Sequence, residues 1–108
     1  MDLRPLVLAL LEAEPLYGYR LVQRAKAKGA LDWEEGTVYP LLHGLEREGL
    51  VKAHWRRAET GRRRRYYELT AAGRRRLKSA RTEWRQQVRT VSSVLLGGRH
   101  GFEGAGAS

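Results

Sequence analysis

The chain of 108 residues contains no cysteine, so it has neither a disulfide framework nor a thiolate metal site. It also contains no apolar run long enough to span a membrane. A secretion signal has a basic segment before its apolar stretch and a small-residue cleavage site after it. The apolar stretch near the N-terminus has neither. These absences predict a cytoplasmic protein.

Groups that could carry catalysis are also few. The three histidines, His43, His54 and His100, are scattered along the chain. No Ser–His–acid or Cys–His arrangement, no HExxH motif and no glycine-rich phosphate loop accompanies them. Without cysteine, they also make a poor zinc-binding set. The sequence therefore predicts no enzyme, no metal and no cofactor.

Acidic residues are scarce relative to basic ones. Asp and Glu total 12 against 21 Lys and Arg, which gives a formal net charge of +9. Most of the basic residues are arginines, which suit bidentate contacts to phosphate and guanine. The excess predicts an anionic partner, without distinguishing DNA from RNA or a membrane surface. The length is enough for one domain with a modest core.

The stretch from Gly36 to Gly49 predicts a helix that is buried on one side, because its apolar residues recur at spacings of three and four: Val38, Leu41, Leu42 and Leu45. Pro40 has no N–H and is expected in the first turn, which makes Thr37 the N-cap and gives that end a phosphate site. Gly49 is expected to end the helix. Such a helix fits a DNA major groove with its outward residues: Thr37, Tyr39, Pro40, His43, Gly44 and Arg47. For His43, an ordinary surface histidine is the alternative to a DNA contact.

A hairpin is expected to follow, with strands over residues 51–56 and 64–69 and a turn at Gly61. Tyr67 and Leu69 share one face of the returning strand, and Tyr66 lies on the other. The tip and the start of this strand carry four adjacent arginines, Arg62, Arg63, Arg64 and Arg65. Like charges repel, so folding alone gives no reason for them. A solvated basic loop is the alternative, but beside a groove-sized helix we favour nucleic acid.

Two helices precede this region. The first, over about residues 3–12, is capped by Asp2 and holds Pro5 in its first turn, with an inward stripe of Leu3, Leu6, Val7, Leu10 and Leu11. Because Leu8 extends the apolar surface further round this helix, a partner subunit is expected to cover part of it.

The second helix, over about residues 17–28, is expected to end at Gly29 and to bury Gly18, Leu21, Val22 and Ala25, with Trp33 closing over the core. Tyr17 and Tyr19 lie in its first turn. They are either half-buried aromatics or hydroxyl donors to phosphate.

Three helices and a hairpin in this order predict a winged helix-turn-helix. The segments LYGYRLVQ, EGTVYPLLHGLEREGLV and GRRRRYYELTAAGRRRL, in this order, resemble the PadR family of bacterial transcriptional regulators over about residues 3–77. The resemblance implies a sequence-specific DNA-binding repressor that binds a palindromic operator as a homodimer. It also supports Tyr19, Thr37 and Tyr39 as DNA contacts and implies a small aromatic or hydrophobic effector. The alternative is a basic winged-helix module that binds RNA or a protein without operator specificity.

The expected organisation is a mostly α fold with a small β-hairpin: a winged helix-turn-helix over 1–69, a dimerisation helix over 70–96 and a flexible tail over 97–108. Thr70 caps the long helix, and Gly73 permits a close approach. Its seam follows coiled-coil spacing through Leu77, Arg81, Trp84, Val88, Val91 and Leu95. Two copies would cover each other there, with Leu8 and Leu11 contributing. An effector slot beside Trp84, walled by Leu8 and Leu11, competes with the alternative that two indoles simply fill the interface.

Overall fold

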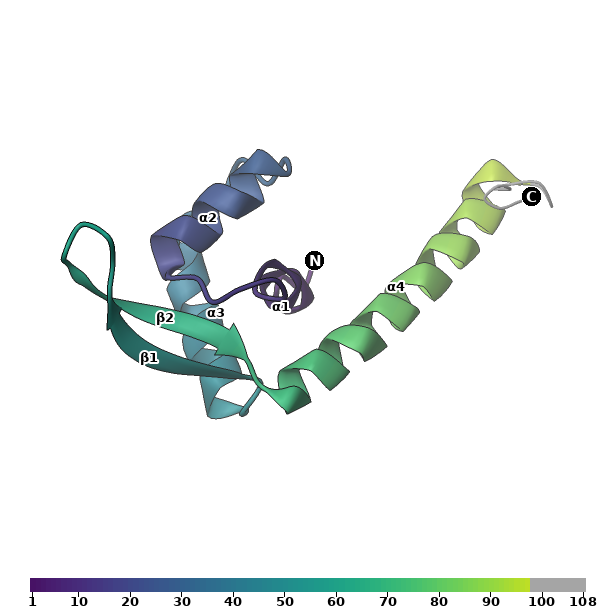
Figure 1. The fold of residues 1–108 in the computed structure, drawn as a ribbon. Helices are drawn as coiled ribbons and strands as arrows, with labels where there is room; N and C mark the ends of the chain where they lie inside the picture. The colour runs from purple at the N-terminus through teal and green to yellow at the C-terminus, as the bar shows by residue number, and fades with distance from the viewer. Residues whose placement is uncertain (98–108) are drawn as a thin grey trace. The chain divides into compact units, whose positions relative to one another are not determined.

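The computed structural model describes residues 1–97 as four helices and one antiparallel hairpin (Figure 1). In chain order the elements are α1 (Arg4–Leu10), α2 (Gly18–Ala27), α3 (Glu35–Arg47), β1 (Val51–Arg57), β2 (Arg63–Leu69) and α4 (Ala71–Leu96). This confirms the predicted mostly helical winged helix-turn-helix with a long last helix. The expected tail lies outside the described residues from position 98 onward. Over residues 1–97, no helix is long and apolar enough to cross a membrane.

The chain forms two compact units, Met1–Leu77 and the part that begins at Lys78. The first unit continues beyond Leu69 because the first turns of α4 pack into its core, where Gly73 and Leu77 are buried. A Cβ on Gly73 would lie only 2.0 Å from the carbonyl oxygen of Leu50, so only glycine permits this approach. The Gly73 N–H donates to Oγ1 of Thr70 at 3.0 Å, which confirms the predicted cap.

Leu77 follows one turn after Gly73 and is 3% exposed. It belongs to the core cluster of its own chain. The prediction that Leu77 contacts a partner subunit is therefore wrong. The close approach at Gly73 draws the start of α4 onto the domain, so the first position of the expected seam is used inside the protomer.

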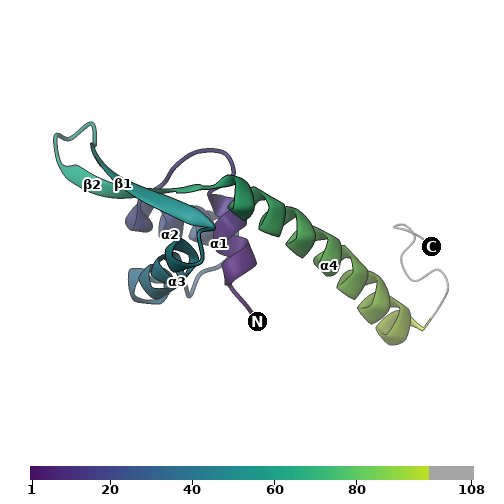
Figure 2. The ribbon, with the colours of Figure 1, turned by 90° about the horizontal axis from the view of Figure 1, so that it is seen from below.

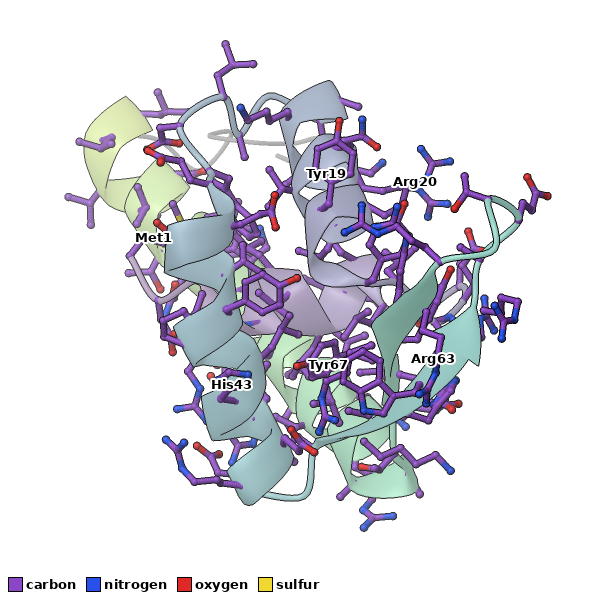
Figure 3. All side chains as sticks on the ribbon, turned by 90° about the vertical axis from the view of Figure 1, so that its left-hand side faces the viewer. Met1, Tyr19, Arg20, His43, Arg63 and Tyr67 are labelled. Carbon is purple, nitrogen blue, oxygen red and sulfur yellow. The ribbon has the colours of Figure 1, made fainter. Side chains whose placement is uncertain are left out.

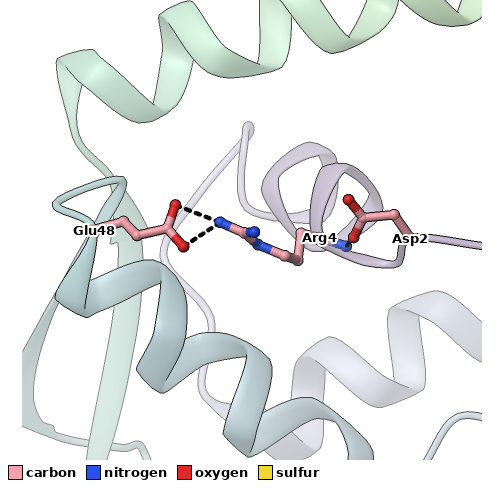
Figure 4. Close-up of polar contacts among 3 residues, drawn as sticks. All are labelled: Asp2, Arg4 and Glu48. Atoms are coloured by element: carbon pink, nitrogen blue, oxygen red, sulfur yellow. Dashed lines mark hydrogen bonds and ion pairs between the residues drawn. The ribbon is translucent and has the colours of Figure 1, made fainter.

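The packing of α1 also differs from the prediction. Leu8 and Leu11 are each 1% exposed and lie in the core, whereas Leu6 is 41% exposed. Neither Leu8 nor Leu11 can therefore face a partner or wall an effector slot, which corrects both expectations. The N-cap of α1 is Leu3 and not the predicted Asp2, although the carboxylate of Asp2 accepts the N–H of Arg4 at 3.0 Å. Figure 4 shows that Arg4 also pairs with Glu48, which ties α1 to the end of α3.

The predicted inner face of α2 is confirmed, since its buried residues are Gly18, Leu21, Val22 and Ala25. Trp33, in the segment that connects α2 to α3, is 5% exposed and belongs to the core, as predicted. Figures 1 and 2 show the three short helices gathered beside one face of the hairpin. Burial of this apolar surface is the main source of stability for so small a unit.

The hairpin pairs Val51 with Leu69 at its base and Arg57 with Arg63 near its tip. Tyr67 and Leu69 are buried on the helix side, as predicted. Backbone bonds in both directions join Leu16 to Tyr67, so the segment before α2 lies along the free edge of β2. The expected alternation fails further out, where Trp55 is 54% exposed and Tyr66 only 8%. The strands extend beyond the helices, and Tyr66 is instead covered by side chains on the outer face.

Candidate nucleic-acid interface

The start of α3 differs from the sequence prediction. The helix begins at Glu35 with Glu34 as its N-cap, and Pro40 lies inside it. The N–H of Thr37 donates to the carbonyl oxygen of Glu34 at 3.0 Å, so Thr37 is within the first turn and is not the cap. A proline inside a helix costs a backbone hydrogen bond, and that cost is tolerated here. Because Glu34 and Glu35 surround the helix end, their charges oppose a phosphate there.

The end of α3 follows the prediction. Gly49 has a φ of 76°, the left-handed conformation that glycine adopts most easily. The N–H of Leu50 donates to Leu45 and that of Gly49 to Glu46, each at 2.9 Å. These two bonds form a Schellman motif, which turns the chain directly into β1.

The outward face of α3 is the one that the sequence predicted. Val38, Leu42 and Leu45 are completely buried on the inner side. The opposite side exposes Thr37, Pro40, His43 and Arg47. Figure 3 looks onto this side, with His43 on α3, Tyr19 and Arg20 on α2 and Arg63 on the hairpin all in view. Three elements of the first unit therefore contribute to one polar face.

Tyr39 joins this face to α2. It is half-buried, and its ring lies so close to Gly18 that a Cβ there would be 2.5 Å from the ring carbon Cζ. Burial raises the pKa of the Tyr39 hydroxyl, and the charge of Glu35 adds to the shift. The hydroxyl therefore stays protonated and can donate. The ring of His43 lies 6.2 Å from that of Tyr39, so the two side chains are neighbours.

The two tyrosines at the start of α2 occupy different environments. Tyr17 precedes the helix in extended conformation and packs edge-on against Tyr66, with ring centroids 5.3 Å apart. Tyr19 is 48% exposed, and its hydroxyl accepts a hydrogen bond from Gln23. Tyr17 thus matches the half-buried alternative, whereas Tyr19 is exposed at the surface of α2.

The four wing arginines do not share one environment, because successive side chains on a strand point to opposite faces. Arg62 and Arg63 are exposed. The guanidinium of Arg64 lies 4.4 Å from the centroid of the Tyr17 ring. Arg65 donates to Glu46 of α3 at 3.1 Å, which links the hairpin to α3. Arg62 and Arg63 are therefore the more exposed pair, although the guanidinium of Arg63 lies 5.5 Å from the centroid of the Trp55 ring.

Sequence reasoning missed a second group of arginines. Arg20, Arg56 and Arg57 join Arg64 in lining a cleft of about 570 Å³ between α2 and the hairpin. The register of the hairpin brings this group together, since Arg56 pairs with Arg64 and Arg57 with Arg63. The expected strands, 51–56 and 64–69, already imply that Arg56 lies opposite Arg64, so the sequence could have indicated this part of the group. Arg57 follows the last residue of the expected first strand.

Glu14 also lines this cleft and is paired with Arg24. The hydrogen bond and the charge of Arg24 hold the pKa of the Glu14 carboxyl below its usual value, and Arg20 and Arg56 add to the effect. Glu14 therefore stays ionised, so the cleft contains one carboxylate that is already paired.

In the second unit, the predicted seam of α4 has little cover of its own. Trp84 is 62% exposed, Val91 52% and Leu95 76%, and Val88 is half-buried.

Over residues 1–97, no group of three or more acidic, histidine or cysteine side chains is placed to hold a metal ion.

Comparison with known proteins adds to this geometry. Residues 7–79 match the sequence profile of the Transcriptional regulator PadR-like family. A transcriptional regulator of Mycobacterium tuberculosis is 41% identical over 71 residues, which are 66% of this chain and 62% of that protein. The match thus spans less than two thirds of that relative.

Solved structures are similar as well. A PadR-like transcriptional regulator from Bacillus cereus has a TM-score of 0.80 at 29% identity, over 86% of this chain and 90% of that one. Bacillus subtilis PadR in complex with operator DNA has a TM-score of 0.63 at 26% identity, over 71% of this chain and 45% of that one.

Proposed function

Because the chain belongs to the PadR-like family of transcriptional regulators, we propose that it represses transcription by binding a palindromic operator as a homodimer. Proteins of this family are DNA-binding regulators, so the chain is not an enzyme, as predicted. The observation that carries the proposal is the exposed face of α3, which lies beside α2 and the wing on one side of the first unit (Figure 3).

In this proposal α3 enters the major groove. Tyr39 and His43 approach base edges from the middle of the helix, and Arg47 reaches the groove from its last turn. Thr37 and Pro40 line the same face. The likeness to Bacillus subtilis PadR, whose structure holds operator DNA, supports this assignment. The dipole of α3 does not contribute to phosphate binding in this proposal, since Glu34 and Glu35 occupy the start of the helix.

The remaining contacts position the protein on the backbone. Tyr19 offers an exposed side chain on α2, whereas Tyr17 acts through the wing, since it packs against Tyr66 and lies under the guanidinium of Arg64. Arg62 and Arg63 extend from the hairpin toward phosphate or the minor groove. Such contacts supply affinity and register more than base specificity.

The homodimer is assigned to α4. An apolar seam of Trp84, Val88, Val91 and Leu95 that stays exposed in one copy favours pairing with a second copy, because burial of apolar surface drives association. A two-fold dimer of this kind presents two α3 helices to half-sites about one helical turn apart, which makes the operator an inverted repeat. Leu8, Leu11 and Leu77 are not part of this interface.

Release of the operator is assigned to a small planar aromatic effector between the two Trp84 indoles. Such a ligand must prefer one spacing of the two α3 helices, since a ligand that binds both states equally shifts nothing. Titration of planar aromatic compounds should quench the emission of wild-type protein and release DNA, with both effects lost in Trp84→Phe. Release of DNA by a compound that acts equally on Trp84→Phe would move the effector site elsewhere.

Footprinting on the DNA upstream of the protein's own gene tests the main proposal. Protection of an inverted repeat that unrelated DNA cannot compete away is the expected result. RNA of equal length should compete poorly. Equal binding to RNA and to unrelated DNA would contradict operator recognition and favour a general nucleic-acid module.

A further inference from the structure

The cleft between α2 and the hairpin gathers positive charge that the fold does not explain. Its lining includes four arginines, Arg20, Arg56, Arg57 and Arg64, and two carboxylates, Glu14 and Glu59. Glu14 is already paired with Arg24. Over residues 1–97, none of the four arginines forms an ion pair. The cleft therefore carries an excess of positive charge, and a bound anion would offset the repulsion between the arginines.

The arginines are held by aromatic rings. The guanidinium of Arg56 lies 3.8 Å from the centroid of the Tyr66 ring, and that of Arg64 lies 4.4 Å from the centroid of Tyr17. These rings pack against each other edge-on, so the two stacked guanidiniums have a fixed separation. Stacking leaves the N–H groups in the guanidinium plane available, and planar forks bind phosphate bidentately.

The other two arginines enter the cleft from its sides. Arg20 comes from α2, on the side that faces the hairpin (Figure 3), and donates to Gln23 at 3.2 Å. Arg57 donates to the carbonyl oxygen of Gly61 at 2.7 Å, which fixes it at the base of the wing turn. Both bonds use neutral acceptors, so neither neutralises the charge. Nε of Arg64 is also buried without a hydrogen-bond partner.

We propose that this cleft binds a phosphate group of the DNA backbone, which makes Arg20 and Arg56 principal phosphate contacts beside the groove-reading face of α3. The inference rests on the proposed function. A free phosphorylated compound has the same chemistry. The backbone is the source that fits the position, because the cleft lies between the two elements that accompany α3 on its exposed side.

The test is the salt dependence of operator binding by the full-length protein. Each phosphate contact contributes about 0.9 to the slope of log K against log salt, and a dimer counts each contact twice. Arg20→Gln combined with Arg56→Gln should therefore lower the slope by about 1.8, since each of the two clefts holds one phosphate. Arg74→Gln combined with Arg76→Gln removes the same charge from exposed positions outside the cleft and should leave the slope nearly unchanged. Arg20→Lys with Arg56→Lys should keep most of the slope, which covers the case in which the glutamine variant folds poorly.

A second arm uses inorganic pyrophosphate at constant ionic strength, with binding followed by tyrosine resonances in the nuclear magnetic resonance spectrum. An unchanged slope in the glutamine variant overturns the proposal. An unchanged slope together with tight pyrophosphate binding by wild type alone assigns the cleft to a free phosphorylated compound instead. Failure of wild-type protein to bind any DNA specifically would overturn the proposed function itself, which is a separate result.

Discussion

Substitution of Gly73 by alanine tests the junction between the winged domain and α4. A Cβ at this position would lie 2.0 Å from the carbonyl oxygen of Leu50 and 3.3 Å from Cδ2 of Leu69. The first contact is with backbone, so it cannot be relieved by a change of rotamer. The start of α4 must move outward, which strains the hydrogen bonds of Thr70 and uncovers Leu77.

The change in the free energy of unfolding follows from one stabilising effect and two destabilising effects. Alanine favours a helix over glycine by roughly 0.5–1 kcal/mol. Overpacking costs roughly 1–3 kcal/mol, and full exposure of a buried leucine costs roughly 1.5–3 kcal/mol. With partial relief of each, Gly73→Ala should lower the free energy of unfolding by about 2–4 kcal/mol. The melting temperature should fall by about 8 °C or more, at roughly 4 °C or more per kcal/mol for a domain of this size.

Urea denaturation at one fixed protein concentration measures the effect, since a dimer makes apparent stability depend on concentration. Gly36→Ala is the matched control, because Gly36 also lies in a helix but has no heavy atom within 4 Å of the added Cβ. The control should be neutral or more stable than wild type. Equal stability of Gly73→Ala and wild type would refute the close approach between α4 and Leu50.

Three further variants test the proposed DNA contacts and the proposed dimer. Tyr39→Ala with His43→Ala should cost on the order of 2–5 kcal/mol of operator affinity in a gel-shift titration, and unchanged affinity in a folded variant would reject α3 as the reader. Arg62→Ala with Arg63→Ala should lower the salt slope by up to about 3.6 for a dimer, whereas an equal slope would make these arginines a solvated surface. Val91→Arg should give monomers in sedimentation, and Gln86→Arg, on the opposite side of α4, should remain dimeric; a dimeric Val91→Arg places the interface elsewhere.

Local signals predicted much of the fold because their causes are local. The inner stripes of α2 and α3 follow from apolar spacing, and Gly49 ends α3 because glycine adopts positive φ easily. Pro40 was misleading for a similar reason. Proline is favourable in a first turn and costly further in, yet α3 holds Pro40 inside the helix and forgoes one hydrogen bond, so proline does not fix where α3 begins.

Other features depend on contacts that spacing cannot specify. Apolar residues at Leu8, Leu11 and Leu77 indicate that something must cover them, but not whether the cover is the same chain or another copy. The close approach at Gly73 brings Leu77 into the core of its own chain. Likewise, the cleft that contains Arg20 and Arg56 exists only once α2 and the hairpin are side by side.

Selection of bound fragments from genomic DNA by the purified protein, at physiological salt, tests the central claim most directly. Sequence-specific regulators bind their sites roughly a thousandfold or more above other DNA, so true sites should be strongly enriched. The account predicts that the enriched fragments share an inverted repeat with half-sites about one helical turn apart. Recovery of fragments with no common sequence, by protein that still binds DNA, would contradict it.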